Sequence, residues 1–123
     1  MVFIKIKVKG YLKNITDNEI TEFEEKAIKS KDKITYVNDS VKTIIRTCDN
    51  DIMLTREGSD FVNTFVFNKK NSRCNYFLKE NNLDVDIDII TNIIDNNDKY
   101  IFIKYVVVDS ECEYEYKIEM SDI

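Results

Sequence analysis

The chain contains no histidine, no proline, no tryptophan and only two glycines. Without histidine there is no Ser-His-Asp or Cys-His pair and no histidine-assisted proton transfer near neutral pH. Two isolated glycines cannot form a G-x-G-x-x-G or a G-x-x-x-x-G-K phosphate loop. We therefore expect no catalytic residues. An enzyme would have to use Glu, Asp, Tyr or Lys, and a single sequence does not show which of these side chains converge.

Cysteine is also scarce, with Cys48, Cys74 and Cys112 widely spaced and no C-x-x-C motif. Because histidine is missing too, a zinc set cannot be completed, and we expect no metal and no cofactor. An odd number of cysteines without a signal peptide is typical of a reducing compartment, which predicts a cytoplasmic location. Residues 1–10 alternate apolar residues with lysine, so they resemble neither a signal peptide nor a membrane anchor.

Positive charge is in short supply, since the net charge is −5 and the pI is about 4.8. An acidic chain disfavours a nucleic-acid partner, whose phosphates require a basic surface. The 123 residues are 43% hydrophobic, which is enough to build a packed interior. The length fits a single domain, so we expect residues 1–123 to form one.

Alternating apolar and charged residues dominate what is present. Residues 2–12, VFIKIKVKGYL, place lysines on one face and aliphatic side chains on the other, as a half-buried strand requires. Residues 83–94, 100–108 and 112–120 show the same period. Shorter strands with hairpin-length gaps precede them, at 34–37, 41–48, 51–57, 61–67 and 72–78. The fold class is therefore all-β. A sandwich remains an alternative, but an antiparallel up-and-down meander barrel of eight to ten strands removes exposed edges.

Residues 18–31, NEITEFEEKAIKSK, are ambiguous. Asn18 could cap a helix in which Ile20, Phe23 and Ala27 fall at helical spacing, and the local evidence leans slightly towards that helix. The strand reading places Phe23 and Ala27 on one face and is the weaker local pattern.

Three aspartates, Asp84, Asp86 and Asp88, alternate along one predicted strand. Neighbours on the same strand face stand roughly 7 Å apart. A calcium ion gathers its oxygens at about 2.3 to 2.6 Å, so the three cannot share one ion. We interpret them as an exposed acidic stripe. Three lysines are candidate cross-strand partners for it: Lys5, Lys7 and Lys9.

The ordered strands ITYV, VKTIIRTCDNDIMLTREG, NTFVF, YFL, DVDIDII and YIFIKYVVVD make the chain resemble the YwiB-like family of small bacterial β-barrels. The resemblance runs over nearly the full length and is most specific at TREG, residues 55–58. It implies a calycin-related, lipocalin-like fold and a strand at 19–29, and it supplies no activity. Members tend to carry a Thr-Pro-Tyr-Gly-like turn after the tyrosine strand, which residues 76–85, YFLKENNLDV, lack.

The TREG segment and the tyrosines supply the candidate site. Gly58 is predicted to take positive φ in the turn before residues 61–67, with Asn63 bonding the backbone of that turn. Arg56 suits a carboxylate or phosphate at a barrel mouth, although a structural salt bridge is its simpler role. If the strands at 41–48 and 51–57 pair, Arg46 lies near Met53 or Leu54. Three tyrosines are candidates to stack on a ligand: Tyr36, Tyr76 and Tyr105.

Two functions follow from these patterns. The first is non-catalytic binding of a small apolar or anionic ligand inside the barrel, which a hollow interior of roughly 300 Å³ or more would favour. The alternative is a protein-interaction or regulatory module that uses its acidic outer strand faces, formed by the aspartate stripe together with Glu113 and Glu115. A filled interior would favour this second reading.

Overall fold

The computed structural model describes residues 3–48 and 51–123, and within these ranges all regular structure is β-strand. Val2 and the predicted turn at 49–50 lie outside the described residues. The strands are β1 (Ile4–Asn14), β2 (Glu19–Ser30), β3 (Lys33–Asn38), β4 (Val41–Cys48), β5 (Asp51–Glu57), β6 (Phe61–Phe67), β7 (Arg73–Leu78), β8 (Leu83–Ile87), β9 (Ile89–Asn96), β10 (Tyr100–Val107) and β11 (Cys112–Asp122).

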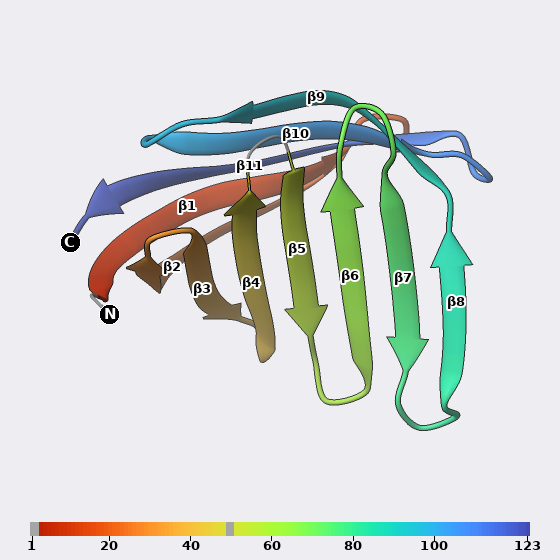
Figure 1. The fold of residues 1–123 in the computed structure, drawn as a ribbon, viewed down its shortest axis with the longest axis horizontal. Coiled ribbons are helices and arrows are strands. Elements are labelled where there is room, and N and C mark those ends of the chain that lie inside the picture. The colour runs from red at the N-terminus through yellow and green to blue at the C-terminus, as the bar shows by residue number, and fades with distance from the viewer. Residues whose placement is uncertain (1–2, 49–50) are drawn as a thin grey trace.

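These strands form one antiparallel sheet in the order β8-β7-β6-β5-β4-β3-β2-β1-β11-β10-β9. The two ends of that order, β8 and β9, are consecutive in the chain and are separated only by Asp88. Residues 83–96 therefore act as one bent strand, whose first part pairs with β7 and whose second part pairs with β10. Figure 1 shows the sheet curling round, with β9, β10 and β11 crossing above β4 to β8. The predicted up-and-down barrel is confirmed and is nearly closed, but the described residues form eleven strands instead of the expected eight to ten.

The ambiguous segment is strand β2, as the family resemblance implies, so the local preference for a helix is wrong. Eleven consecutive residue pairs join β2 to β1, from Ile4 opposite Lys29 to Asn14 opposite Glu19. Phe23 and Ala27 point into the barrel. Non-local pairing and burial override the helix propensity of Glu, Ala and Lys, because that propensity is only a weak local preference.

The expected pairing of the aspartate stripe with the lysines of the first strand is also wrong. In a meander each strand pairs with its chain neighbours, so β8 lies beside β7, whereas β1 lies between β2 and β11. Asp84 and Asp86 instead accept hydrogen bonds from the Asn75 side-chain amide on β7. Lys7 forms its ion pair with Glu24 on β2.

The barrel has two unlike ends. At the packed end, where β1 begins and β11 finishes, the interior is filled by aliphatic side chains that are almost fully buried: Val8, Ile45, Ile52, Ile101, Ile103 and Ile118. The open end carries the turns at 15–18, 39–40, 58–60, 79–82 and 108–111. Figure 1 shows two of these turns, β5–β6 and β7–β8, at the lower edge of the view.

Gly58 does lie in the turn that joins β5 and β6, but neither glycine of the chain has a positive φ, so that part of the prediction is wrong. The Gly58 amide donates to the Phe61 carbonyl at 3.0 Å. A Cβ at position 58 would lie 2.6 Å from Cε1 of the Phe61 ring. Glycine here makes room for that ring. The positive φ angles occur in other turns, at Asn18, Asp39, Ser40, Asn82 and Glu111.

Gly10 has a tighter requirement. A Cβ there would lie 2.7 Å from the Phe23 ring and 2.8 Å from Cγ2 of Ile118, and it would overlap the carbonyl oxygen of Lys117. The missing side chain lets the Phe23 ring lie across β1 inside the barrel. The backbone of β11 cannot move away without breaking its pairing with β1.

We predict that Gly10→Ala lowers the free energy of unfolding by about 1 to 3 kcal/mol, because it overpacks a site closed by backbone atoms. Urea denaturation followed by circular dichroism measures the effect. Gly58→Ala is the matched control, and its cost should be smaller because the three closest atoms belong to the movable Phe61 side chain. Equal stability of Gly10→Ala and the wild type would contradict this packing.

Candidate ligand-binding chamber

A row of polar side chains crosses the inner face of the barrel from β3 to β7. Strand pairing creates it, because Tyr36 is opposite Thr43, Thr43 is opposite Arg56, Arg56 is opposite Asn63, and Asn63 is opposite Tyr76. Directly paired residues of adjacent strands share one sheet face. We call these five residues the polar row.

The next inward row towards the packed end is almost wholly apolar. It consists of Ile34, Ile45, Leu54, Phe65, Cys74 and Ile87, which are likewise paired across β3 to β8. Side chains on one strand face alternate with those on the other, so the two rows are two residues apart along each strand. The polar row therefore lies between an apolar floor and the open end.

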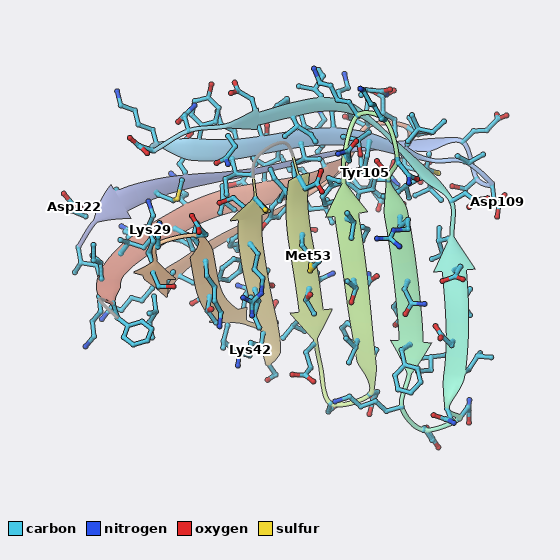
Figure 2. All side chains as sticks on the ribbon, in the orientation of Figure 1. Lys29, Lys42, Met53, Tyr105, Asp109 and Asp122 are labelled. Atoms are coloured by element: carbon cyan, nitrogen blue, oxygen red, sulfur yellow. The ribbon has the colours of Figure 1, made fainter. Side chains whose placement is uncertain are left out.

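Above this floor is a chamber of about 520 Å³. Polar-row members Tyr36, Thr43, Arg56 and Asn63 line it. The opposing wall comes from β1, β2, β10 and β11, and the residues lining that wall are Leu12, Thr21, Phe23, Tyr105, Val107, Tyr114 and Tyr116. In Figure 2, Tyr105 lies near the upper ends of β6 and β7. Its ring centroid is 5.8 Å from that of Phe65 and 5.1 Å from that of Phe67.

The structure brings together three of the five predicted ligand-binding residues: Arg56, Tyr36 and Tyr105. Tyr76 belongs to the polar row but does not line the chamber, and its ring stacks on Phe61 at 5.6 Å. Arg46 pairs with Met53 as expected, yet it is exposed on the outer face of β4 and does not reach the chamber.

Asn63 does not bond the backbone of the turn. It lies within β6, and its side-chain oxygen accepts a hydrogen bond from the thiol of Cys74 at 3.5 Å. Burial, together with the nearby charge of Asp86, raises the pKa of Cys74 to about 11. The thiol is therefore protonated near neutral pH and can donate to Asn63. With its oxygen engaged in this way, Asn63 has its amide NH₂ group for other partners.

Arg56 is half-buried, and the structural salt bridge that was its simpler predicted role does not form with any described residue. Within residues 3–48 and 51–123, no carboxylate lies within ion-pair distance of its guanidinium. Its cross-strand neighbours are Thr43 and Asn63, and neither is acidic. The adjacent Glu57 forms an ion pair with Lys79 at 3.6 Å.

Three chamber tyrosines lie close enough to Arg56 for its charge to act on them: Tyr36 in the same polar row, and Tyr105 and Tyr116 on the opposing wall. The Tyr36 and Tyr116 hydroxyls are hydrogen-bonded to each other at 2.6 Å, and both rings are buried. Burial raises the pKa of Tyr36, Tyr105 and Tyr116 above the usual value of 10, and the positive charge of Arg56 opposes that shift in each case. These hydroxyls therefore stay neutral near pH 7, which leaves Arg56 as the charged group of the chamber lining.

Thr43 and Phe23 line the chamber but were not predicted from the sequence, and Tyr114 and Tyr116 were not among the three tyrosines singled out. Tyr114 and Tyr116 belong to the alternating segment 112–120, and both pack in the interior. Thr43 lies two residues before the buried Ile45 on β4, so strand alternation puts both side chains on the inner face. This pattern could have identified Thr43. Phe23 could be assigned to the inner face of the barrel only after residues 18–31 were known to form a strand.

In residues 3–48 and 51–123 there is no group of three or more Cys, Asp or Glu residues arranged to hold a metal ion. The same residues contain no membrane-spanning helix.

The sheet topology and the interior define a small up-and-down β-barrel that is packed at one end and hollow at the other. Among solved structures, the chain is similar to the crystal structure of the YwiB protein from Bacillus subtilis, with a TM-score of 0.70 and 17% sequence identity over 98% of this chain and 92% of that chain. The predicted YwiB-like resemblance is thus confirmed at the level of the fold. No family model matches the chain, and no curated protein does either.

The raised tyrosine pKa values predict a stability loss in alkali. Below pH 10 a tyrosine is neutral in both the folded and the unfolded chain, so its burial stabilises the fold fully. Above about pH 10 the unfolded chain loses tyrosine protons first, and stability falls until the folded-state pKa is reached. That pKa is about 12 for Tyr11, which is partly buried and bonded to Glu115.

We therefore expect an unfolding free energy that is insensitive to tyrosine ionisation up to about pH 9 and that decreases above pH 10. Urea denaturation across this range, with tyrosinate absorbance as the specific readout, measures it. If all seven tyrosines of the folded protein titrated together near pH 10, the buried arrangement of Tyr36 and Tyr116 would be incorrect.

Proposed function

We propose that this protein is a non-catalytic binding barrel that holds a small amphipathic anion in its chamber. The observation that carries the proposal is Arg56, an inward-facing arginine without a carboxylate partner in the described residues. A partly desolvated charge is costly unless it is paired. A bound anion would supply the missing partner.

The surroundings of Arg56 support the apolar half of that ligand. Leu54, Phe65 and Phe67 form part of the floor, and Ile87 and Ile89 continue it. Ligand sites are typically cavities of about 300 to 1,000 Å³ lined mainly by apolar and aromatic side chains with a few placed polar groups. The chamber, at about 520 Å³, falls in this range.

The alternative of a protein-interaction module on the acidic outer faces has less support. Asp84 and Asp86 are engaged by the Asn75 amide, and Glu113 forms an ion pair with Lys104 at 3.0 Å. These carboxylates already have partners within the barrel. The three cysteines are free, in keeping with the reducing, cytoplasmic compartment that we propose for the protein.

Binding of an anionic naphthalenesulfonate dye tests the proposal, because the dye combines an apolar body with one permanent charge. We predict saturable binding to the wild type and a dissociation constant raised about tenfold or more in Arg56→Gln, the loss expected for a charged hydrogen bond. Fluorescence titration measures both. Arg46→Gln is the matched control, since it removes the same charge from the outer face.

Loss of folding does not confound this comparison. Arg56→Gln breaks no ion pair in the described residues, so the unfolding free energy of the unliganded variant should stay the same or rise. Equal weakening by the Arg46 and Arg56 substitutions, or the absence of saturable dye binding, would refute the proposed function.

A further inference from the structure

We infer that the chamber selects a flat aromatic monocarboxylate, with its carboxylate on Arg56 and Asn63 and its ring system against the aromatic walls. This inference rests on the proposed function and narrows it to one ligand class. The charge, the hydrogen-bond donors and the shape of the chamber each point to that class.

The residues that line the chamber carry one positive charge, and the neighbouring carboxylate of Glu25 accepts a hydrogen bond from the Asn38 amide at 2.8 Å. Arg56 is the charged member of the chamber lining, and the tyrosines and the cysteine that share it are neutral at pH 7. A phosphate monoester carries about −1.5 to −2 at that pH. Most of its second charge would remain unpaired in a partly desolvated site, which is costly. A carboxylate is fully matched by one arginine.

The donors fit a carboxylate. Arg56 and Asn63 are directly opposite each other on β5 and β6, so their side chains stand next to each other on the inner face. The thiol of Cys74 occupies the Asn63 oxygen, which assigns the NH₂ group as the donor. One guanidinium fork and one amide can together satisfy both oxygens of a carboxylate.

The walls fit a ring. One aromatic cluster comprises Phe23 stacked on Tyr36, with centroids 5.2 Å apart, and Tyr116. A second cluster comprises Phe65, Phe67, Tyr105 and Tyr114, with neighbouring centroids 5.1 to 5.8 Å apart.

Both clusters line the chamber, so a planar ligand meets ring surface on two walls. Aromatic contacts add to the energy of area burial. A rigid ring system also loses less conformational freedom on binding than an alkyl chain does.

Isothermal titration calorimetry with four matched probes tests this selectivity on the wild-type protein. The probes are naphthoate, naphthamide, naphthyl phosphate and decanoate. Relative to naphthoate, naphthamide removes the charge, naphthyl phosphate increases it, and decanoate replaces the ring system by an alkyl chain. We expect naphthoate to bind tightest and naphthamide to bind about tenfold weaker, because it lacks the charge-assisted hydrogen bonds. Naphthyl phosphate and decanoate should also bind more weakly than naphthoate.

Asn63→Asp is the diagnostic variant. Its shape is nearly unchanged, but its carboxylate would neutralise Arg56 internally and repel the ligand, so naphthoate affinity should fall about tenfold or more. Thr64→Asp, which adds the same charge to the adjacent outward-facing position of β6, is the control and should leave the affinity unchanged. Circular dichroism and urea denaturation verify that both variants fold.

Each other outcome overturns a distinct statement. Equal affinity for naphthoate and naphthamide, or preference for the phosphate or for decanoate, would overturn the aromatic monocarboxylate class. Dye binding that depends on Arg56, combined with no naphthoate binding, would overturn this inference and leave the proposed function standing. Failure of both the dye and naphthoate to bind would refute the two together.

Discussion

Cross-strand register is the constraint on which the rest of this structure depends. Consecutive strands pair from β1 to β8 and from β9 to β11, and the first strand, β1, pairs with the last, β11. The chain runs from β8 through Asp88 into β9, and this continuity joins the two ends of the sheet order. A shift of one residue in any pair would move a whole set of side chains to the other face. The polar row exists because four successive pairings, from Tyr36 to Tyr76, all place polar residues on the inner face at the same level.

In the proposed function, the packed end of the barrel supplies stability and the hollow end supplies the ligand site. Near-fully buried residues such as Ile45, Ile103 and Ile118 supply the hydrophobic stabilisation on the packed side. The hollow side contains Arg56, which is partly buried and forms no ion pair with any residue that the structure describes. Partial burial of an unpaired charge costs folding free energy, and proteins typically tolerate such a cost at functional sites. Gly10 also shapes the hollow end. Because it has no side chain, the Phe23 ring has room to lie in the chamber wall.

In the proposed function, the interior tyrosines and Cys74 act as neutral binding groups. Burial keeps Tyr36 and Tyr116 protonated and hydrogen-bonded to each other, and it raises the pKa of the Cys74 thiol to about 11. Neutral groups of this kind orient and select a ligand, whereas a nucleophile or general base requires a pKa near the working pH. In the site that we propose, electrostatic selection rests on the Arg56 guanidinium, and shape selection rests on the aromatic walls.

Local sequence determined most of the strands and their inward faces, because a period of two, as in Ile6 and Val8 or in Tyr114 and Tyr116, is visible along the chain itself. It also marked Arg56 and Tyr36 as candidates. Residues 18–31 could not be assigned locally, since pairing with β1 decided their conformation. Only the tertiary structure placed Thr43, Arg56 and Asn63 side by side, left Arg46 outside and moved Asn63 from the turn to the chamber. The physical reason is that register between strands is a non-local property, fixed by how the whole sheet closes around its core.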